Sequence, residues 1–367
     1  MRDFAGTAQG SFYGFWLEIN RHGEPSKTKF AIQYGTEFPS IRKQKFAIFR
    51  LFLLLSSFLI AGPCIAQDYL IPSDTFSSSR FLTLAAGGSI LYGGTVVGLN
   101  EAWYKGFDRT PFHFFNDWQE WNNMDKMGHL YTAYFETELS YRGARWTGIK
   151  DPGAIWLAAG LGILFQSTIE FFDAHSARWG FSIYDMTYNL SGTALFTIQQ
   201  LSWRDQRIRM KISSWPRKYS TAPLFSDNSP ETSTLRSRAT ALFGDGYLER
   251  YLKDYNAQTV WVSVNLHSFT ASTKVPRWFN LALGFGSENL FGGFTNNWTE
   301  GEANFSLSQD YKRYRQWYLS PDIDFRKIKT DSPVLKTLFN LINVFKIPAP
   351  AIEYNANGKW RWHWLHL

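Results

Sequence analysis

Residues 151–173, DPGAIWLAAGLGILFQSTIEFFD, contain a long apolar run that follows an Asp-Pro pair. Asp151 is a typical N-cap residue and proline is favoured in the first turn, so we expect a helix that ends near residue 173. Glu170 is the only charged residue after Pro152 and before residue 173, and the run is long enough to cross a bilayer. Its glycines suit a buried bundle helix equally well.

Three further helices are expected around this one. Residues 81–104 are apolar, long enough to cross a bilayer and rich in glycine, which lets helices approach closely. Another helix should cover residues 123–146, or 125–146, and a last one should open with a capping-box-like pattern over residues 182–203. Because the connections are short, neighbouring helices should be antiparallel. We therefore predict a four-helix, membrane-associated bundle over residues 80–203.

The second half of the chain alternates apolar and polar side chains with a period of two, which is typical of strands. Such runs are residues 260–267, 281–285, 317–325 and 360–364. One amphipathic helix should interrupt them, with Ser332 as its cap and Pro333 in its first turn. The predicted fold class is α+β, in which the helical bundle precedes an antiparallel β region over residues 241–367.

Residues 204–240 separate the two halves and are predicted to be a linker, first basic and then rich in Ser, Thr and Pro. Residues 203–218 carry six Lys and Arg against Asp205, which suits anionic lipid head groups.

The N-terminal region has the pattern of a targeting sequence. Residues 41–67, IRKQKFAIFRLFLLLSSFLIAGPCIAQ, hold a basic segment, an apolar segment and small residues before the expected cleavage site. We predict a signal peptide over residues 43–66, and an uncleaved membrane anchor is the alternative. Residues 1–42 should be a leader, either disordered or produced by a mis-assigned start. The only cysteine, Cys64, would leave with the signal peptide, so the mature chain would lack disulfides.

The composition narrows the function class. The chain of 367 residues is 44% hydrophobic and 19% charged, which excludes a disordered protein. Aromatic residues make up 18%, as expected for large buried aromatic surfaces or lipid contact. The net charge of +7 falls once residues 1–66 are removed, because these hold twice as many basic as acidic residues. The remaining balance predicts no nucleic-acid partner.

Polar side chains recur on one face of three otherwise apolar helices. They are Asp125, His129, Thr132 and Glu136 on the second helix, with Lys126 beside them, Gln166, Glu170 and Asp173 on the third, and Asp185 and Asn189 on the fourth. Because a buried unpaired charge is costly, we expect these stripes to meet in one polar site between the helices. The alternatives are local: Asp125 and Asp185 could cap their helices, and His129 could be a satisfied core histidine.

The same residues are the candidates for chemistry. The catalytic candidates are His129 as general acid and base, Asp125 to orient it, and Glu170 or Asp185 as a second carboxylate. The binding candidates are Lys126, for an anionic head group, and Glu136, Asp173 and Asn189.

We predict no cofactor and no metal. The chain has no glycine-rich nucleotide loop, P-loop, zinc-protease motif or nucleophile elbow. An oxygen and nitrogen metal site from Asp173, His175 and His129 is the alternative, although positions at a helix end explain the first two equally well.

The ordered set Asp125-Lys126-Met-Gly-His129, Tyr134, Glu170 and Asp185-x-x-x-Asn189-x-x-Gly192 resembles the pattern of VanZ-like membrane proteins. The wider sequence resembles an uncharacterised bacterial family, the predicted periplasmic lipoproteins of domain of unknown function 2279. FHFFNDWQEWNNMDKMGH, WGFSIYD and KDYNAQTVWVSVNLHSF carry this second resemblance, which covers roughly residues 80–367. It implies a location in the cell envelope and no established reaction. The chain departs from a lipoprotein signal at Cys64, which follows Pro63.

Two function classes remain. The first is an exported envelope protein, membrane-associated or periplasmic, that has a structural or binding role and whose partner is membrane lipid or another envelope component. The second is an enzyme that acts on an envelope lipid or lipid-linked substrate by carboxylate and histidine acid-base chemistry. We favour the first, because the sequence contains no complete nucleophile-base arrangement. The sequence makes no prediction about the oligomeric state of the protein.

Overall fold

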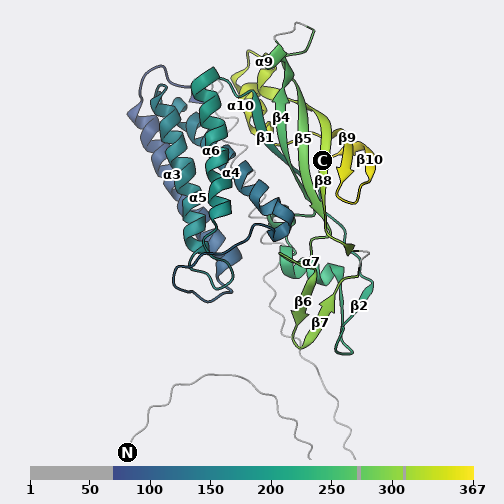
Figure 1. Ribbon diagram of the computed structural model, residues 1–367. Coiled ribbons are helices and arrows are strands. Elements are labelled where there is room, and N and C mark those ends of the chain that lie inside the picture. The colour runs from purple at the N-terminus through teal and green to yellow at the C-terminus, as the bar shows by residue number, and fades with distance from the viewer. Residues whose placement is uncertain (1–68, 271–273, 309–310) are drawn as a thin grey trace, which may run out of the picture. The chain divides into compact units, whose positions relative to one another are not determined.

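The computed structural model describes residues 69–367 apart from 271–273 and 309–310 (Figure 1). These residues belong to the second of two units of the chain, Pro63–Leu367. The predicted leader and signal peptide lie outside the described residues.

The first half of the described chain is helical, as predicted. Its helices are α3 (Ser78–Leu99), which continues into the π-helical turn η1 (Asn100–Tyr104), α4 (Met124–Trp146), α5 (Gly153–Asp173) and α6 (Ile183–Trp203). Figure 1 shows α4, α5 and α6 side by side, and these three pack closely against one another. No residue of α3 is buried, so the packed core has three helices and α3 lies outside it.

Glycine allows α4 to approach both of its neighbours. A Cβ atom at Gly192 of α6 would lie 2.3 Å from the Leu130 carbonyl oxygen of α4. A Cβ atom at Gly162 of α5 would lie 2.3 Å from the Thr137 hydroxyl of α4. The two helices therefore contact α4 at distances that a larger residue would prevent.

The helix caps agree only in part with the sequence patterns. The Ser182 hydroxyl accepts a hydrogen bond from the Asp185 amide at 3.0 Å and caps α6, as expected. Asp151 does not cap α5, because its carboxylate instead accepts a hydrogen bond from the Tyr141 hydroxyl at 3.2 Å. Asp125 does not cap α4 either, since the N-cap is Asn123 and has no side-chain cap bond.

The second half contains a six-stranded antiparallel sheet in the order β1-β4-β5-β8-β9-β10. The strands are β1 (Ile208–Ser214), β4 (Gln258–Asn265), β5 (Phe279–Glu288), β8 (Tyr314–Ile323), β9 (Ala349–Asn355) and β10 (Trp360–His366). Two hairpins, β2 (Pro223–Phe225) with β3 (Thr232–Thr234) and β6 (Asn297–Glu300) with β7 (Ala303–Ser306), form separate small sheets. The α+β fold class is confirmed.

Two details of this half correct the sequence analysis. The segment that we expected to be a linker, residues 204–240, includes β1, which pairs with β4 over its whole length. Besides the predicted amphipathic helix α10 (Pro333–Ile342), whose cap is Ser332, the region contains further short helices. They are α7 (Leu235–Phe243), α8 (Tyr247–Lys253), α9 (Leu266–Thr270) and the turn η4 (Phe325–Lys327).

The outer edge of β1 is bridged at one residue, Ile212. The Ile212 amide donates to the Val344 carbonyl at 3.1 Å, and the Lys346 amide donates to the Ile212 carbonyl at 2.9 Å. Residues 344–346 lead directly into β9, on the far side of the strand order. The sheet therefore curls back toward its first strand.

The two faces of the sheet differ sharply in polarity. The face that the curl encloses buries Trp261 and Tyr318 together with charged and polar side chains, among them Lys211, Asp322 and Glu353. The opposite face is apolar, and near β1 and β4 it packs on the helices. That contact forms a buried cluster of Tyr134, Phe196, Met210 and Val260.

Away from the helices the same apolar face is exposed. Leu283 has an exposed fraction of 57% and Trp360 of 71%. The other exposed members are Trp317, Leu319, Ile352, Tyr354 and Trp362. We call these seven residues the outer apolar face. The alternation along the strands puts apolar side chains on the outside of the sheet and polar side chains on the inside. This is the reverse of the pattern in a sheet that is exposed to water.

Candidate functional site

A lysine without solvent contact lies at the centre of a charge cluster between the helices. The Lys126 ammonium is 2.6 Å from Asp117, 2.6 Å from Asp185 and 3.0 Å from Asp125, and its side chain has an exposed fraction of 0%. Burial disfavours the charged ammonium, but the carboxylates of Asp125 and Asp185 raise the pKa of Lys126 well above its usual range. Lys126 therefore stays charged and neutralises part of the cluster.

His129 lies one turn farther along α4, next to the same carboxylates. Its Nδ1 is 3.0 Å from the Asn189 side-chain oxygen, which accepts a hydrogen bond from it. Its Nε2 is 3.8 Å from Asp125 Oδ1 and 3.8 Å from Asp185 Oδ2. Burial opposes protonation of the ring, but Asp185 and Asp125 outweigh it and raise the pKa of His129 to about 9.

Glu170 of α5 completes the inner part of the cluster. Its carboxylate accepts hydrogen bonds from the Ser182 amide at 3.3 Å and from the Asn189 side chain at 3.5 Å. His129 Nδ1 is 3.8 Å from Glu170 Oε1. The structure thus brings together six predicted residues from three helices: Asp125, Lys126, His129, Glu170, Asp185 and Asn189.

Three residues of the cluster were not predicted. Asp117 binds Lys126 and accepts a hydrogen bond from the Ser182 hydroxyl at 2.6 Å. Glu120 lies near Asp125, and burial, with the Asp125 charge, raises the pKa of Glu120 to about 7. The Tyr255 hydroxyl donates to Asp125 Oδ1 at 3.0 Å from the second half of the chain. All three lie outside the regular helices, where helical spacing carries no information.

Three residues singled out in the sequence have other partners. Glu136 accepts a hydrogen bond from Gln166 at 2.8 Å. Asp173 accepts one from the Tyr104 hydroxyl at 2.8 Å. His175 bonds to the Phe171 carbonyl at 2.8 Å, so its Nδ1 is engaged within its own helix end. From the sequence we considered a metal site of Asp173, His175 and His129. The structure instead brings one possible metal-ligand atom each of Asp125, His129 and Asp185 within 4.8 Å of one another.

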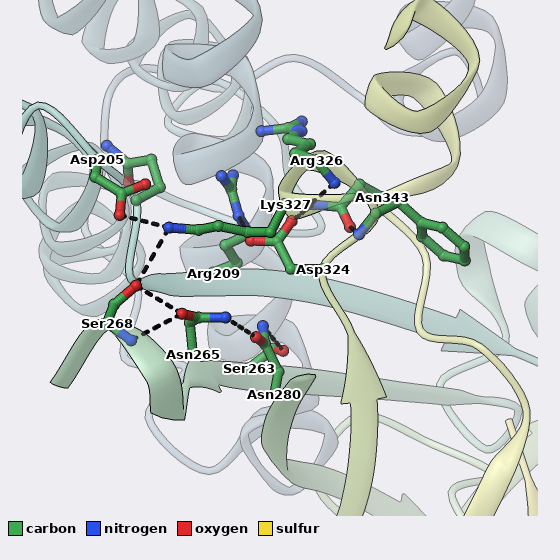
Figure 2. Close-up of polar contacts among 12 residues, drawn as sticks. Asp205, Arg209, Ser263, Asn265, Ser268, Asn280, Asp324, Arg326, Lys327 and Asn343 are labelled. Carbon is green, nitrogen blue, oxygen red and sulfur yellow. Dashed lines mark hydrogen bonds and ion pairs between the residues drawn. The ribbon is translucent and has the colours of Figure 1, made fainter. Parts of the chain in front are cut away.

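A second polar network joins α4 to the sheet. Arg209 of β1 binds Asp324 at 3.0 Å and Glu138 of α4 at 3.1 Å, and Arg326 also binds Glu138. Figure 2 shows Arg209 beside Asp324, which accepts a further hydrogen bond from Asn343 at 3.0 Å. This network was not predicted from the sequence, because Arg209 was expected to lie in the linker and its partners are distant in the sequence.

The network continues across the enclosed face of the sheet. Figure 2 follows it from Asp205 through Lys327 and Ser268 to Asn265 and Asn280. These contacts are made by buried or half-buried polar groups, and each has a partner within hydrogen-bonding distance, which is what keeps such groups stable away from water.

Residues 113–200 match the model of a protein family described as Predicted periplasmic lipoprotein (DUF2279). The matched stretch contains α4, α5, most of α6 and the loop with Asp117. No curated protein and no solved structure gives a match to the chain. The family description supports the predicted export and places the chain in the cell envelope. The resemblance to VanZ-like proteins stays a prediction.

Proposed function

We propose that the protein is an exported cell-envelope protein that associates with a membrane through two apolar surfaces. In this proposal the charge cluster between α4, α5 and α6 is a polar binding site held beside the membrane. The inverted polarity of the sheet supports the proposal most directly.

The outer apolar face suits lipid better than water. In a sheet exposed to water, the buried face is apolar and the exposed face is polar. Here Lys211 and Asp322 are fully enclosed and form an ion pair of 2.8 Å, whereas Leu283 and Trp360 are exposed. An apolar patch of this extent on a soluble monomer would favour aggregation, and contact with acyl chains removes that cost.

The helices provide the second apolar surface. α3, with 22 residues, and α5, with 21, are each long and apolar enough to cross a membrane. α3 buries none of its side chains. On α5 the side chains of Trp156, Leu164 and Phe171 are exposed, at spacings that place them on one side of the helix.

Spin labels test the contact with lipid at single positions. Cysteine replaces Leu283 or Leu319 on the outer apolar face, or the exposed Glu231 beside a hairpin as the control, in a chain with Cys64→Ser. In native membranes, labels at 283 and 319 should collide more with oxygen than with a water-soluble nickel chelate, and the label at 231 should show the reverse. Equal access of the chelate to all three labels, together with release of the protein by alkaline carbonate, would exclude membrane association.

The convergence of His129, Asp125, Asp185 and Glu170 favours a second candidate function. In this alternative the protein is an enzyme that acts on an envelope lipid or lipid-linked substrate. His129 transfers the proton, Asp125 orients it, one of the other carboxylates assists, and Lys126 attracts an anionic head group.

Alanine substitution of His129 or Glu170 distinguishes the two functions. Purified protein is incubated with envelope lipids, and the products are followed by mass spectrometry. An enzyme loses turnover while its melting temperature is kept. If the wild-type protein shows no turnover and both variants melt at a lower temperature, the enzyme is excluded and the binding function is supported.

A further inference from the structure

Three possible ligand atoms, one each from Asp125, His129 and Asp185, lie within 4.8 Å of one another between α4 and α6. Asp125 Oδ1 and Asp185 Oδ2 are each 3.8 Å from His129 Nε2. These separations exceed the roughly 3.2 Å limit of a nitrogen–oxygen hydrogen bond, so no direct bond joins the ring nitrogen to either carboxylate. Two ligands of a tetrahedral ion, at about 2.1 Å from it, lie about 3.4 Å apart. The observed spacing is within a few tenths of an ångström of that value.

The remaining polar atoms of the same side chains are already occupied. Lys126 binds the other oxygen of each carboxylate, Asp185 Oδ1 at 2.6 Å and Asp125 Oδ2 at 3.0 Å. Asn189 accepts the hydrogen bond of His129 Nδ1 at 3.0 Å. Metal-binding histidines usually donate their second N–H in this way, which leaves Nε2 as the ligand. Asp125 Oδ1, His129 Nε2 and Asp185 Oδ2 therefore remain as the possible ligand atoms. Asp125 Oδ1 also accepts the hydrogen bond of the Tyr255 hydroxyl at 3.0 Å, which leaves its second lone pair for an ion.

The charges of the cluster also call for a cation. Asp117, Asp125 and Asp185 surround Lys126, so three carboxylates share one ammonium. With all three carboxylates ionised and His129 neutral as a ligand, a divalent ion at this place would balance the remaining charge, and its binding would displace a proton from His129. Because these side chains are largely buried, water compensates little of that charge.

We propose that Asp125, His129 and Asp185 bind one divalent transition-metal ion, of which Zn²⁺ is the best fit. A set of one imidazole and two carboxylates suits Zn²⁺ better than Ca²⁺ or Mg²⁺, which prefer oxygen ligands alone. Three protein ligands leave a fourth position for water or for an anionic group of a bound molecule. This inference rests on the polar site of the proposed function and is independent of its lipid contact.

The experiment uses the full chain, purified in detergent and treated with a chelator. Calorimetric titration with Zn²⁺ should give one ion per chain, confirmed by elemental analysis after desalting. His129→Gln and Asp125→Asn should each weaken binding at least 100-fold. The matched controls His267→Gln, on α9, and Glu101→Gln, in an exposed pair with Lys105, should bind as the wild type does.

X-ray absorption of the Zn²⁺-loaded wild type keeps the proposal testable if a variant does not fold. The spectrum should contain one imidazole and only oxygen otherwise, at about 2.0–2.2 Å. Less than one ion per chain, equal binding by His129→Gln and His267→Gln, or a spectrum with no imidazole would overturn the proposal. Because titration is done in detergent, failure here leaves the spin-label result untouched, and the reverse also holds.

Discussion

Lys126 contacts three carboxylates and no solvent, so its contribution to stability should be large. Lys126→Met keeps an unbranched side chain that is one atom shorter, and it leaves Asp117, Asp125 and Asp185 without their ammonium. We expect the free energy of unfolding to fall by about 3–5 kcal/mol, as is typical when one partner of a buried ion pair is removed. Chemical unfolding in detergent, followed by circular dichroism, measures the change.

Lys105→Met is the control, because Lys105 forms an ion pair of 2.7 Å with Glu101 on an exposed surface. Exposed pairs of this kind contribute little, so this variant should unfold with the wild type. A Lys126→Met protein that is as stable as Lys105→Met would mean that the cluster is hydrated.

The lowered pKa of Glu138 predicts how the free energy of unfolding depends on pH. Burial disfavours its charged form, but Arg326, Arg142 and Arg209 outweigh burial and hold the pKa of Glu138 well below its usual range. A depressed pKa stabilises the folded state above the unfolded value, about 4.3 for Glu, and this contribution is lost as the pH falls toward the folded value. The stability difference between wild type and Glu138→Gln should be constant from pH 8 to 5 and shrink below about pH 4.

Urea unfolding at a series of pH values measures this difference. Glu101→Gln provides the reference, because its difference from the wild type should stay near zero throughout. A difference for Glu138→Gln that grows on acidification would show that Glu138 is protonated in the folded protein at neutral pH.

At the scale of elements, the contact between α4 and α6 depends on Gly192. An added Cβ would lie 2.3 Å from the Leu130 carbonyl oxygen and 3.0 Å from the Tyr134 amide nitrogen, both of which are backbone atoms. Gly192→Ala must therefore separate the two helices, and we expect a loss of about 1–3 kcal/mol, as for other overpacked sites. The melting temperature in detergent reports this loss.

Gly160→Ala on α5 is the matched control. Nothing lies within 4 Å of a Cβ atom at Gly160, so the gain in helix propensity, up to about 1 kcal/mol, should appear alone. Equal melting temperatures of the two variants would contradict the close contact of α4 with α6.

The helices and most long strands were predictable from local signals. The apolar run before Asp173 and the cap at Ser182 depend only on neighbouring residues, and so does the alternation in residues 260–267. β1 was missed because Arg209 and Lys211 look like members of a basic linker. Their partners, Asp324 and Asp322, are more than 100 residues away, and no local pattern reveals them.

The same limit applies to the charge cluster. Helical spacing puts Asp125 and His129 on one face and Asp185 and Asn189 on another, so their convergence could be expected. Asp117 and Tyr255 contact the cluster from irregular segments, where the direction of a side chain follows from tertiary packing alone. Glu136 shares the face of His129 by spacing, yet Gln166 holds it elsewhere.

For the whole described molecule, the helices and the sheet should unfold together. The buried cluster of Tyr134, Phe196, Met210 and Val260 takes two residues from helices and two from strands. Loss of either part would expose this cluster. We therefore expect the unfolding transitions followed by far-ultraviolet circular dichroism and by tryptophan fluorescence to coincide. Phe196→Ala should lower the free energy of unfolding obtained from either signal by about 3–5 kcal/mol.

Separate transitions for the two signals would show that the two halves are independent domains. Leu201→Ala, at an exposed position of α6, serves as the control and should shift neither transition appreciably.

The pairing of β1 with residues 344–346 also sets an order of events during biogenesis. In a chain that emerges from its N-terminus, β1 is available long before residues 344–346. During that interval Lys211 lacks Asp322, and the strand offers an unpaired edge to other chains. We therefore expect the outer edge of β1 to stay open to other chains until the last quarter of the chain has emerged.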